Sequence, residues 1–278
     1  MSGVAKGTAS TARDAAELAA VQPLQPVEGG RWRGLVVPVA AVALWWLLSS
    51  LDIVNSALLV LPAKVFDTAV DQIVSGRLWR ALSASLLREA TGFVIGTVAG
   101  LGLGALLGLS PLFNRIVGPS FNTFKQISLF AWIPLISVWF GLGDVAKVVF
   151  LSLAALVPVV VNTCDGIRTA PAGLLEVARV YGYTRWQTVT QVVLPAALPS
   201  IFTGVYLALI YSWLATIGAE YLLVSGRGIG NTLIEGSEHF QMDLVIFGMV
   251  VIGTVGWLMN ASARALERRL SRWTGRAT

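Results

Sequence analysis

The chain of 278 residues is 55% hydrophobic and only 13% charged, with a mean hydropathy of +0.73. Soluble domains carry about 25% charged residues, so this composition excludes an ordinary soluble domain and predicts several membrane-spanning helices. The net charge of +5 does not indicate nucleic-acid binding, because the basic residues lie mainly on predicted cytoplasmic segments. A single cysteine, Cys164, excludes an intrachain disulfide and a cysteine metal cluster.

The N-terminal region combines a polar tail with a first apolar segment. Residues 1–30 are rich in alanine and lack an apolar period, which predicts a mobile cytoplasmic tail. The apolar run over residues 34–50 is not followed by a small-residue cleavage site, so we interpret it as a first span and not as a signal peptide. Residues 51–82 are amphipathic and predict one or two interfacial helices outside the membrane.

A strip of glycines marks the second predicted span, residues 86–109. Glycines at four-residue spacing leave a shallow groove along one side of a helix, which lets another helix approach closely. We expect the partner to be a helix of the same chain, and a dimer contact is the alternative. The glycines are Gly92, Gly96, Gly100, Gly104 and Gly108.

Four further apolar runs bring the predicted number of spans to six, which makes the chain an all-α membrane protein. The stretch between the second and third spans carries Arg115 and Lys125 and is predicted to be a cytoplasmic loop, whereas the polar stretch 225–243 is an outside loop. Residues 31–263 would then form the transmembrane domain, followed by a basic cytoplasmic tail over residues 264–278. The four further spans are about 127–140, 145–163, 201–224 and 244–260.

The polar segment 166–200 lies between the fourth and fifth spans. Its sequence predicts a first short helix that ends at Gly182, because glycine adopts the left-handed conformation that closes many helices. Thr184 and Gln187 then form a capping-box pattern that starts a second short helix. We expect this second helix to end just before Pro195, because proline disfavours helical geometry in the residue that precedes it.

The distribution of basic residues places the segment 166–200 on the cytoplasmic side. With six spans and both termini inside, 14 of the 20 Lys and Arg residues lie inside. Five lie clearly outside, and Arg88 lies near one end of a span. The excess on one side follows the positive-inside rule.

Common motifs for nucleotide binding and for catalysis are absent from the sequence. No P-loop pattern occurs, and neither an H-E-x-x-H nor a G-x-S-x-G motif is present. We therefore expect no catalytic residues, no metal site and no bound cofactor in this chain. Any active process must be driven by a partner protein or by an ion gradient.

The segment 166–200 resembles the EAA loop of ABC-importer permeases. That loop reads E-A-A, three residues, glycine, about nine residues and then I/V-x-L-P. Here Glu176-Val177-Ala178 precedes Gly182, and Val193-Leu194-Pro195 closes the pattern, with Val177 in place of the usual alanine. The resemblance covers about residues 34–272. The stretches 132–147, 161–168, 194–205 and 266–273 are similar to the permeases for aliphatic sulfonates, taurine and nitrate.

The resemblance implies a type I ABC importer permease fold with a cytoplasmic coupling helix between the fourth and fifth spans. It implies a homodimer of permease chains in a bacterial cytoplasmic membrane, surrounded by lipid, with both termini in the cytoplasm. Two separate ATPase subunits would bind ATP and Mg²⁺, and a periplasmic or lipid-anchored binding protein would deliver the substrate. We expect the ATPase contacts among Leu174, Leu175, Glu176, Val177, Ala178, Arg179, Tyr181, Gly182, Arg185, Leu194 and Pro195.

The substrate path is predicted from polar residues in otherwise apolar spans. Ser212, Thr216 and Glu220 are spaced by four residues, so they share one face of a helix. Intramembrane polar residues indicate functional positions, although a negatively charged side chain is an unusual host for an anion. The candidates are Ser128, Trp132, Ser137, Asn162, Ser212, Trp213, Thr216 and Glu220.

The resemblance favours an aliphatic sulfonate or taurine as the transported molecule. Nitrate and a pyrimidine-type vitamin precursor are alternatives on the same machinery. An ion-coupled secondary transporter is a second class, although the sequence shows no clear inverted repeat. An intramembrane enzyme is a third class, for which no catalytic set is found.

Overall fold

The computed structural model describes residues 33–51, 60–223 and 226–271. The predicted tail 1–30 lies outside these residues. Residues 264–271 of the predicted C-terminal tail continue the last helix. The chain divides into two units at residues 53 and 54, and the first of them contains a single described helix, α2 (Arg33–Ser50).

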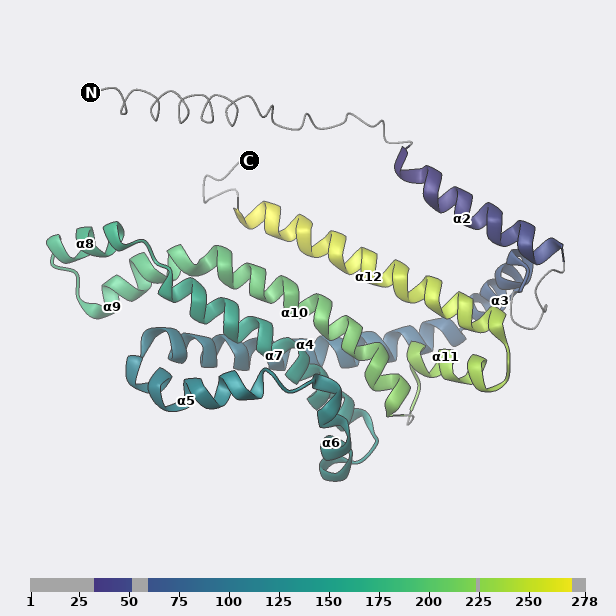
Figure 1. Ribbon diagram of the computed structural model, residues 1–278, viewed down its shortest axis with the longest axis horizontal. Coiled ribbons are helices and arrows are strands. Elements are labelled where there is room, and N and C mark those ends of the chain that lie inside the picture. The colour runs from purple at the N-terminus through teal and green to yellow at the C-terminus, as the bar shows by residue number, and fades with distance from the viewer. Residues whose placement is uncertain (1–32, 52–59, 224–225, 272–278) are drawn as a thin grey trace, which may run out of the picture. The chain divides into compact units, whose positions relative to one another are not determined.

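The second unit is helical throughout its described part, and no strand occurs there (Figure 1). Two of its elements depart from α geometry: η1 is a 3₁₀ turn and η2 is a π turn. In chain order the elements are α3 (Pro62–Val74), α4 (Arg77–Leu109), α5 (Pro111–Phe124), η1 (Leu129–Trp132), α6 (Ile133–Phe140), α7 (Asp144–Arg168), α8 (Ala172–Val180), α9 (Arg185–Thr188), η2 (Val189–Val193), α10 (Leu194–Leu222), α11 (Ile229–Glu238) and α12 (Met242–Ser271).

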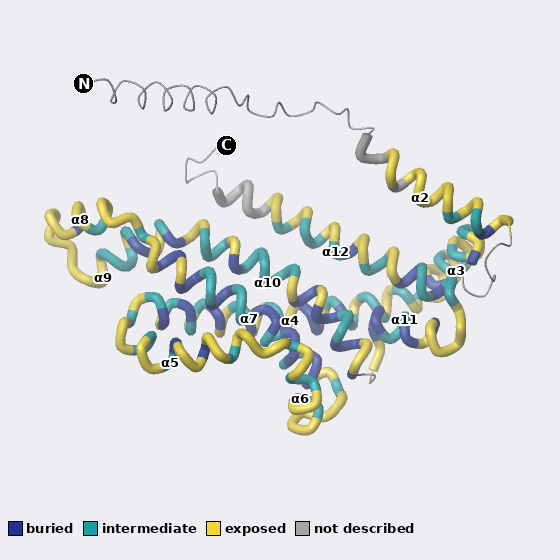
Figure 2. The backbone as a smooth tube through the Cα atoms, viewed as in Figure 1, coloured by how far each residue is buried: buried dark blue, intermediate teal, exposed yellow. Residues whose placement is uncertain are grey.

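Helices α4, α7 and α10 form the core of this unit, with α7 packed between the other two. Figure 2 shows the buried stretches of the three helices where they meet. Phe150 and Val159 of α7 and Ala208 of α10 are fully buried there. Because α7 has neighbours on two sides, its buried positions spread around the helix, and Phe150 and Val159 belong to separate clusters.

The glycine strip of α4 faces α7. A Cβ atom added at Gly104 would lie 2.7 Å from the Thr163 Cβ atom, and one added at Gly108 would lie 2.9 Å from the Ile167 Cβ atom. Gly92, Gly96 and Gly100 likewise lie against α7. Without side chains on this face the two backbones approach closely, which gives α4 and α7 a long contact within one chain.

Adding one methyl group to this strip is expected to destabilise the fold. In the Gly100→Ala variant the new methyl carbon would lie 2.8 Å from the Val159 Cβ atom and 3.1 Å from the Leu156 carbonyl oxygen. Overpacking of this kind lowers the free energy of unfolding by about 1–3 kcal/mol. The matched control is Gly102→Ala on the same helix, because no atom lies within 4 Å of its added Cβ.

Denaturant unfolding in detergent micelles measures both glycine variants. We expect Gly102→Ala to be neutral or more stable by up to about 1 kcal/mol, since alanine has the higher helix propensity. Equal effects of the two substitutions would contradict the close contact between α4 and α7.

Four helical segments are long and apolar enough to cross a membrane: α4, α7, the continuous segment Arg185–Leu222, and α12 over Met242–Ala265. A fifth candidate is the pair Pro111–Phe124 and Leu129–Phe140, which is bent by 94°. The described part of α2 contains a shorter apolar helix, Val39–Ser50. The count of six spans therefore stays a prediction.

Several helices differ in extent from the predicted segments. The helix of the second predicted span begins at Arg77, so α4 extends well into the segment 51–82 that was predicted to be interfacial. The predicted cytoplasmic loop after it contains helix α5, which Ser110 caps by accepting a hydrogen bond from the Phe113 N–H at 3.2 Å. The dipeptide Ser110-Pro111, a cap followed by proline at the first helical position, is the sequence signal for this helix.

Candidate functional site

The segment between α7 and α10 folds into two short helices joined by a tight turn. Helix α8 ends at Val180, and Gly182 follows with a φ of +67°. The Tyr183 N–H donates to the Ala178 carbonyl oxygen at 3.0 Å, which is the hydrogen bond of a Schellman motif. Thr184 and Gln187 then form the predicted capping box at the start of α9. The local structure predicted for Gly182 and for the cap is confirmed.

The predicted helix break at Pro195 is wrong. A π turn, η2, follows α9 directly, and α10 continues from Leu194, so residues 185–222 form one helical segment. The Leu194 N–H donates to the Val189 carbonyl oxygen, five residues back. In a regular α-helix the Pro195 ring would collide with the carbonyl group four residues earlier. The wider π turn accommodates the ring, so the helix is not interrupted.

Apolar side chains of α8 and α9 are exposed. Val177 is 53% exposed, and Tyr181 and Trp186 are each 76% exposed. Leu174, Val177 and Tyr181 border a shallow cavity of about 340 Å³ that Pro195 closes from the start of α10. Large exposed apolar surfaces mark interaction sites, so this end of the molecule is suited to a protein partner.

The other predicted coupling residues divide into buried and exposed positions. Ala178 is buried and Leu175 half-buried, where Leu175 packs against the cluster of Ile167 and Val193. These positions anchor α8 to α7 and to the π turn. The exposed positions are Glu176, Arg179, Gly182, Arg185 and Leu194.

Three of the predicted path residues lie together on a second surface. Ser128, Trp132 and Asn162 border a mostly apolar groove of about 660 Å³ between η1, α7 and α10. The Asn162 side-chain amide donates to the Pro158 carbonyl oxygen at 2.8 Å. Tyr211 lines the groove from α10. Ser137 does not border it, and its hydroxyl donates to the Pro134 carbonyl oxygen at 2.8 Å within α6.

The predicted path residues of α10 are buried inside the protomer. Ser212, Trp213 and Thr216 are each 5% exposed or less, and none of them borders the groove. The Ser212 hydroxyl donates to the Glu89 carboxylate at 3.0 Å, which joins α10 to α4. Trp213 lies against Gly256 of α12. Ser212 and Trp213 therefore join α10 to neighbouring helices, whereas the Thr216 hydroxyl donates to the Ser212 carbonyl oxygen within α10 at 2.9 Å.

Glu220 is the centre of a buried polar cluster. Its carboxylate forms an ion pair with Arg88 of α4, and their side chains are 1% and 7% exposed. The same carboxylate accepts hydrogen bonds from the Ser85 hydroxyl at 2.7 Å and from the Gly230 N–H at 2.8 Å. A second guanidinium nitrogen of Arg88 contacts Asp144 at 2.7 Å. The cluster therefore joins α4, α7, α10 and the start of α11.

This network was missed in the sequence analysis, which placed Arg88 only near the end of a span. Lys147 of α7 is buried beside it and interacts electrostatically with Arg88 and Glu220. The available signal was the presence of ionisable residues of both signs in different spans, since such residues need partners inside a membrane. Within the described residues, no group of three or more His, Cys, Asp or Glu side chains is placed to hold a metal ion.

Comparison with known proteins identifies the family. Residues 92–275 match the model of the binding-protein-dependent transport system inner membrane component. The chain belongs to this family. A putative aliphatic sulfonates transport permease protein of Bacillus subtilis is 35% identical over 88% of this chain and 88% of its own length. The taurine transport system permease protein of Escherichia coli is 29% identical over 84% of this chain and 86% of its own.

The fold of this permease is that of a type I ABC importer. The inward-facing MetNI methionine ABC transporter matches with a TM-score of 0.60 and 24% sequence identity, covering 69% of this chain and 95% of that chain. The chain is therefore a multi-pass membrane permease of an ABC importer. ATP hydrolysis in such transporters is the task of a separate subunit.

Proposed function

We propose that this permease carries a small sulfonate, an aliphatic sulfonate or taurine, into the cell. The observation that carries the proposal is the 35% identity with the sulfonate permease over nearly the whole chain. In this proposal a soluble or lipid-anchored binding protein delivers the substrate from outside, and membrane lipid surrounds the transmembrane helices. Both termini lie in the cytoplasm, in agreement with the basic residues that the sequence places there.

The segment of α8 and α9 is the proposed docking site for the ATPase. Two ATPase subunits, which bind ATP and Mg²⁺, would each cover the exposed side chains of Leu174, Val177 and Tyr181. An amphipathic helix that presents spaced apolar anchors is suited to a groove on a partner. Full burial of an exposed aliphatic side chain contributes about 1.5–3 kcal/mol, and because Leu174 and Val177 are already about half-buried, docking would gain only part of this for each.

The continuous helix after Gly182 is the proposed mechanical link. Residues 185–222 span 38 positions, which corresponds to about 57 Å at 1.5 Å per residue. A displacement of α9 by the ATPase would reach the far end of α10 without an intervening loop. The π turn at Val189–Val193 is what keeps this segment helical past Pro195.

The groove that contains Ser128, Trp132 and Asn162 is the proposed wall of the substrate path. It is open and mostly apolar, and it lies on the surface of a single permease chain. A second copy of the permease, related by twofold symmetry, would face it with the same groove, and the path would run between the copies. Ser128 and Asn162 would then provide hydrogen bonds for an anionic group.

Transport by the reconstituted complex tests the proposal. Liposomes that contain the permease, its cognate ATPase and its binding protein are expected to accumulate labelled taurine only when ATP is present on the ATPase side. Excess ethanesulfonate should inhibit this uptake, and excess nitrate should not. The control complex contains an ATPase variant that binds but does not hydrolyse ATP. Uptake of nitrate without uptake of any sulfonate would reject the proposed substrate class.

A further inference from the structure

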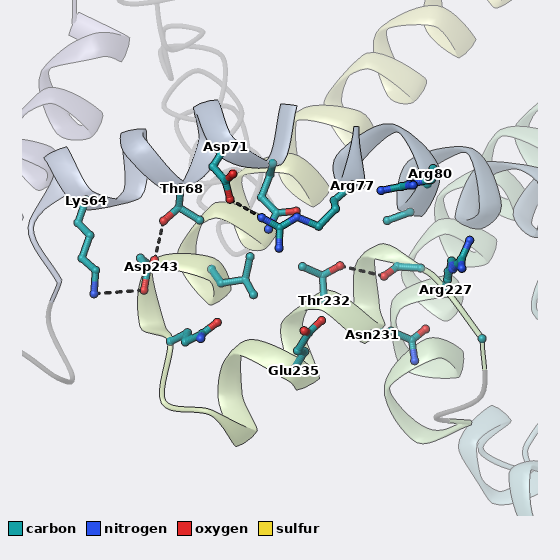
Figure 3. Close-up of a pocket in the computed structure, with 16 residues that line it drawn as sticks. Lys64, Thr68, Asp71, Arg77, Arg80, Arg227, Asn231, Thr232, Glu235 and Asp243 are labelled. Atoms are coloured by element: carbon teal, nitrogen blue, oxygen red, sulfur yellow. Dashed lines mark hydrogen bonds and ion pairs between the residues drawn. The ribbon is translucent and has the colours of Figure 1, made fainter. Parts of the chain in front are cut away.

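Figure 3 shows a polar cavity of about 690 Å³. It lies beyond the C-terminal end of α10, whereas the coupling segment lies at the N-terminal end of that helix (Figure 1). It is bordered by α3, the first turn of α4, the segment before α11, and the starts of α11 and α12. Its volume falls in the range of about 300–1,000 Å³ that is typical of small-molecule sites. The cavity is separate from the groove of Ser128 and Asn162, with which it shares no residue.

Charged side chains dominate this cavity, and two ion pairs account for four of them. Arg77 pairs with Asp71, and Lys64 pairs with Asp243 at 3.7 Å. The Thr68 hydroxyl also donates to Asp243, at 2.5 Å. These contacts lie toward the α3 side of the cavity, as Figure 3 shows.

Three charged side chains of the cavity form no ion pair with any described residue: Arg80, Arg227 and Glu235. The Arg80 guanidinium has one long hydrogen bond, to the Ser75 carbonyl oxygen at 3.5 Å. In Figure 3, Arg80 borders the cavity from α4 and Arg227 borders it from the segment before α11. Glu235 borders it from α11. The cavity therefore presents two available cations and one available anion.

The backbone that positions Arg227 is held by the buried cluster. The Arg227 carbonyl oxygen accepts a hydrogen bond from Arg88 at 2.5 Å, and the next residue, Gly228, lies directly against the Glu220 carboxylate. The Thr232 hydroxyl donates to the Gly228 carbonyl oxygen at 3.2 Å, which ties the segment to α11. Because the Arg227 carbonyl group and the following residue, Gly228, are held in place, less backbone order is lost there when a ligand binds.

We infer that this cavity binds a small zwitterion, with its acidic group on Arg80 and Arg227 and its ammonium group on Glu235. Guanidinium groups bind sulfonate and carboxylate oxygens through charge-assisted hydrogen bonds, and a carboxylate does the same for an ammonium group. The choice of an aminosulfonate as the ligand rests on the proposed function. The site would favour 2-aminoethanesulfonate over ethanesulfonate, which lacks the cation.

Equilibrium binding to the full-length permease in lipid nanodiscs, without ATPase or binding protein, tests the site. Dissociation constants for taurine and for ethanesulfonate are measured by ligand-observed NMR titration at low ionic strength. We expect Arg227→Gln to weaken binding of both ligands about tenfold, the effect of losing one charge-assisted hydrogen bond. Arg80→Gln should act in the same direction. Glu235→Gln should weaken taurine binding about tenfold and leave ethanesulfonate unchanged or slightly tighter.

Two control variants match the cavity variants in the kind of substitution: one lies on α11, the helix of Glu235, and the other lies on α5, away from the cavity. Glu238→Gln alters an exposed carboxylate on α11 that does not border the cavity, and Arg115→Gln alters an exposed arginine of α5. Both controls should bind the two ligands as the wild type does. The inference is overturned if the wild type binds neither ligand, or if the cavity variants and the controls bind alike. A Glu235→Gln variant that keeps the wild-type preference for taurine also overturns it.

Binding and transport fail independently in these experiments. A complex that transports no sulfonate would reject the proposed function, whereas the nanodisc titration would still show whether the cavity binds a zwitterion. Taurine uptake by a permease whose affinity is unchanged by substitutions in the cavity would reject the inference alone.

Discussion

We expect the free energy of unfolding of the Glu220→Gln variant to be about 3–5 kcal/mol lower than that of the wild type. Removing one partner of a buried ion pair leaves the other charge desolvated and uncompensated. In the variant, Arg88 would keep a hydrogen bond to the Arg227 carbonyl oxygen, but its remaining carboxylate partner among the described residues would be Asp144, whose side chain is 67% exposed. Lys147, a second buried base, lies close by and would repel Arg88.

The expected loss is large because the Glu220 carboxylate satisfies several donors at once. Beside Arg88, it accepts hydrogen bonds from the Ser85 hydroxyl and the Gly230 N–H. Gly228 lies so close to the carboxylate that no side chain fits between them. Glutamine has nearly the same shape, but its side-chain amide has only one acceptor oxygen. Its NH₂ group would therefore face a group that donates a hydrogen bond to the carboxylate in the wild type, and that hydrogen bond would be lost.

Denaturant unfolding in mixed micelles measures this effect, with Asp144→Asn as the matched control. The control removes a mostly exposed carboxylate from the same arginine, so we expect a loss of at most about 1 kcal/mol. Arg88→Met combined with Glu220→Gln should be more stable than the sum of the single effects predicts, because no buried charge of the pair remains. A Glu220→Gln variant as stable as Asp144→Asn would contradict the assignment of the buried pair.

The Gly182→Val variant is expected to reduce ATP-driven uptake about 5- to 30-fold while the transmembrane domain stays folded. Gly182 has a φ of +67°, a conformation that costs other L-residues about 1–2 kcal/mol and β-branched residues more. No atom lies within 4 Å of a Cβ added there, so the strain arises from the backbone and not from a steric clash. A change in this turn would relieve the strain and would move α8 relative to α9.

Gly143→Val is the matched control for this turn. Gly143 also has open space around an added Cβ, but its φ of −81° suits any residue. The Gly182→Asn variant should recover part of the activity, because asparagine tolerates the left-handed region. Uptake and ATPase activity are measured on the reconstituted complex, with thermal unfolding as the test of folding. Wild-type uptake by Gly182→Val at equal expression would show that the turn does not couple the two subunits.

The sequence by itself determined the features that depend on composition and on neighbouring residues. Long apolar runs identify a membrane protein because the hydrocarbon core of the bilayer requires apolar side chains, however the helices pack against one another. The end of α8 at Gly182 and the cap of α9 at Thr184 follow from contacts within a few residues, so they are legible from the sequence. The resemblance of one short segment, residues 176–195, to the EAA loop predicted the family, and the match of residues 92–275 to the family model confirms the family.

Features that depend on distant residues were decided only by the tertiary structure. Arg88 and Glu220 are separated by 132 positions, and no local pattern indicates that they form a pair. The glycine strip predicts close packing, but only the fold identifies α7 as the partner helix. The cavity is lined by Arg80 of α4, Glu235 of α11 and Arg227, which are far apart in the sequence and lie close only in the fold. The π turn before Pro195 keeps the segment helical although proline locally favours a break. For the ion pair, the glycine strip and the cavity, a contact between separate segments selects one arrangement among several that the local sequence allows.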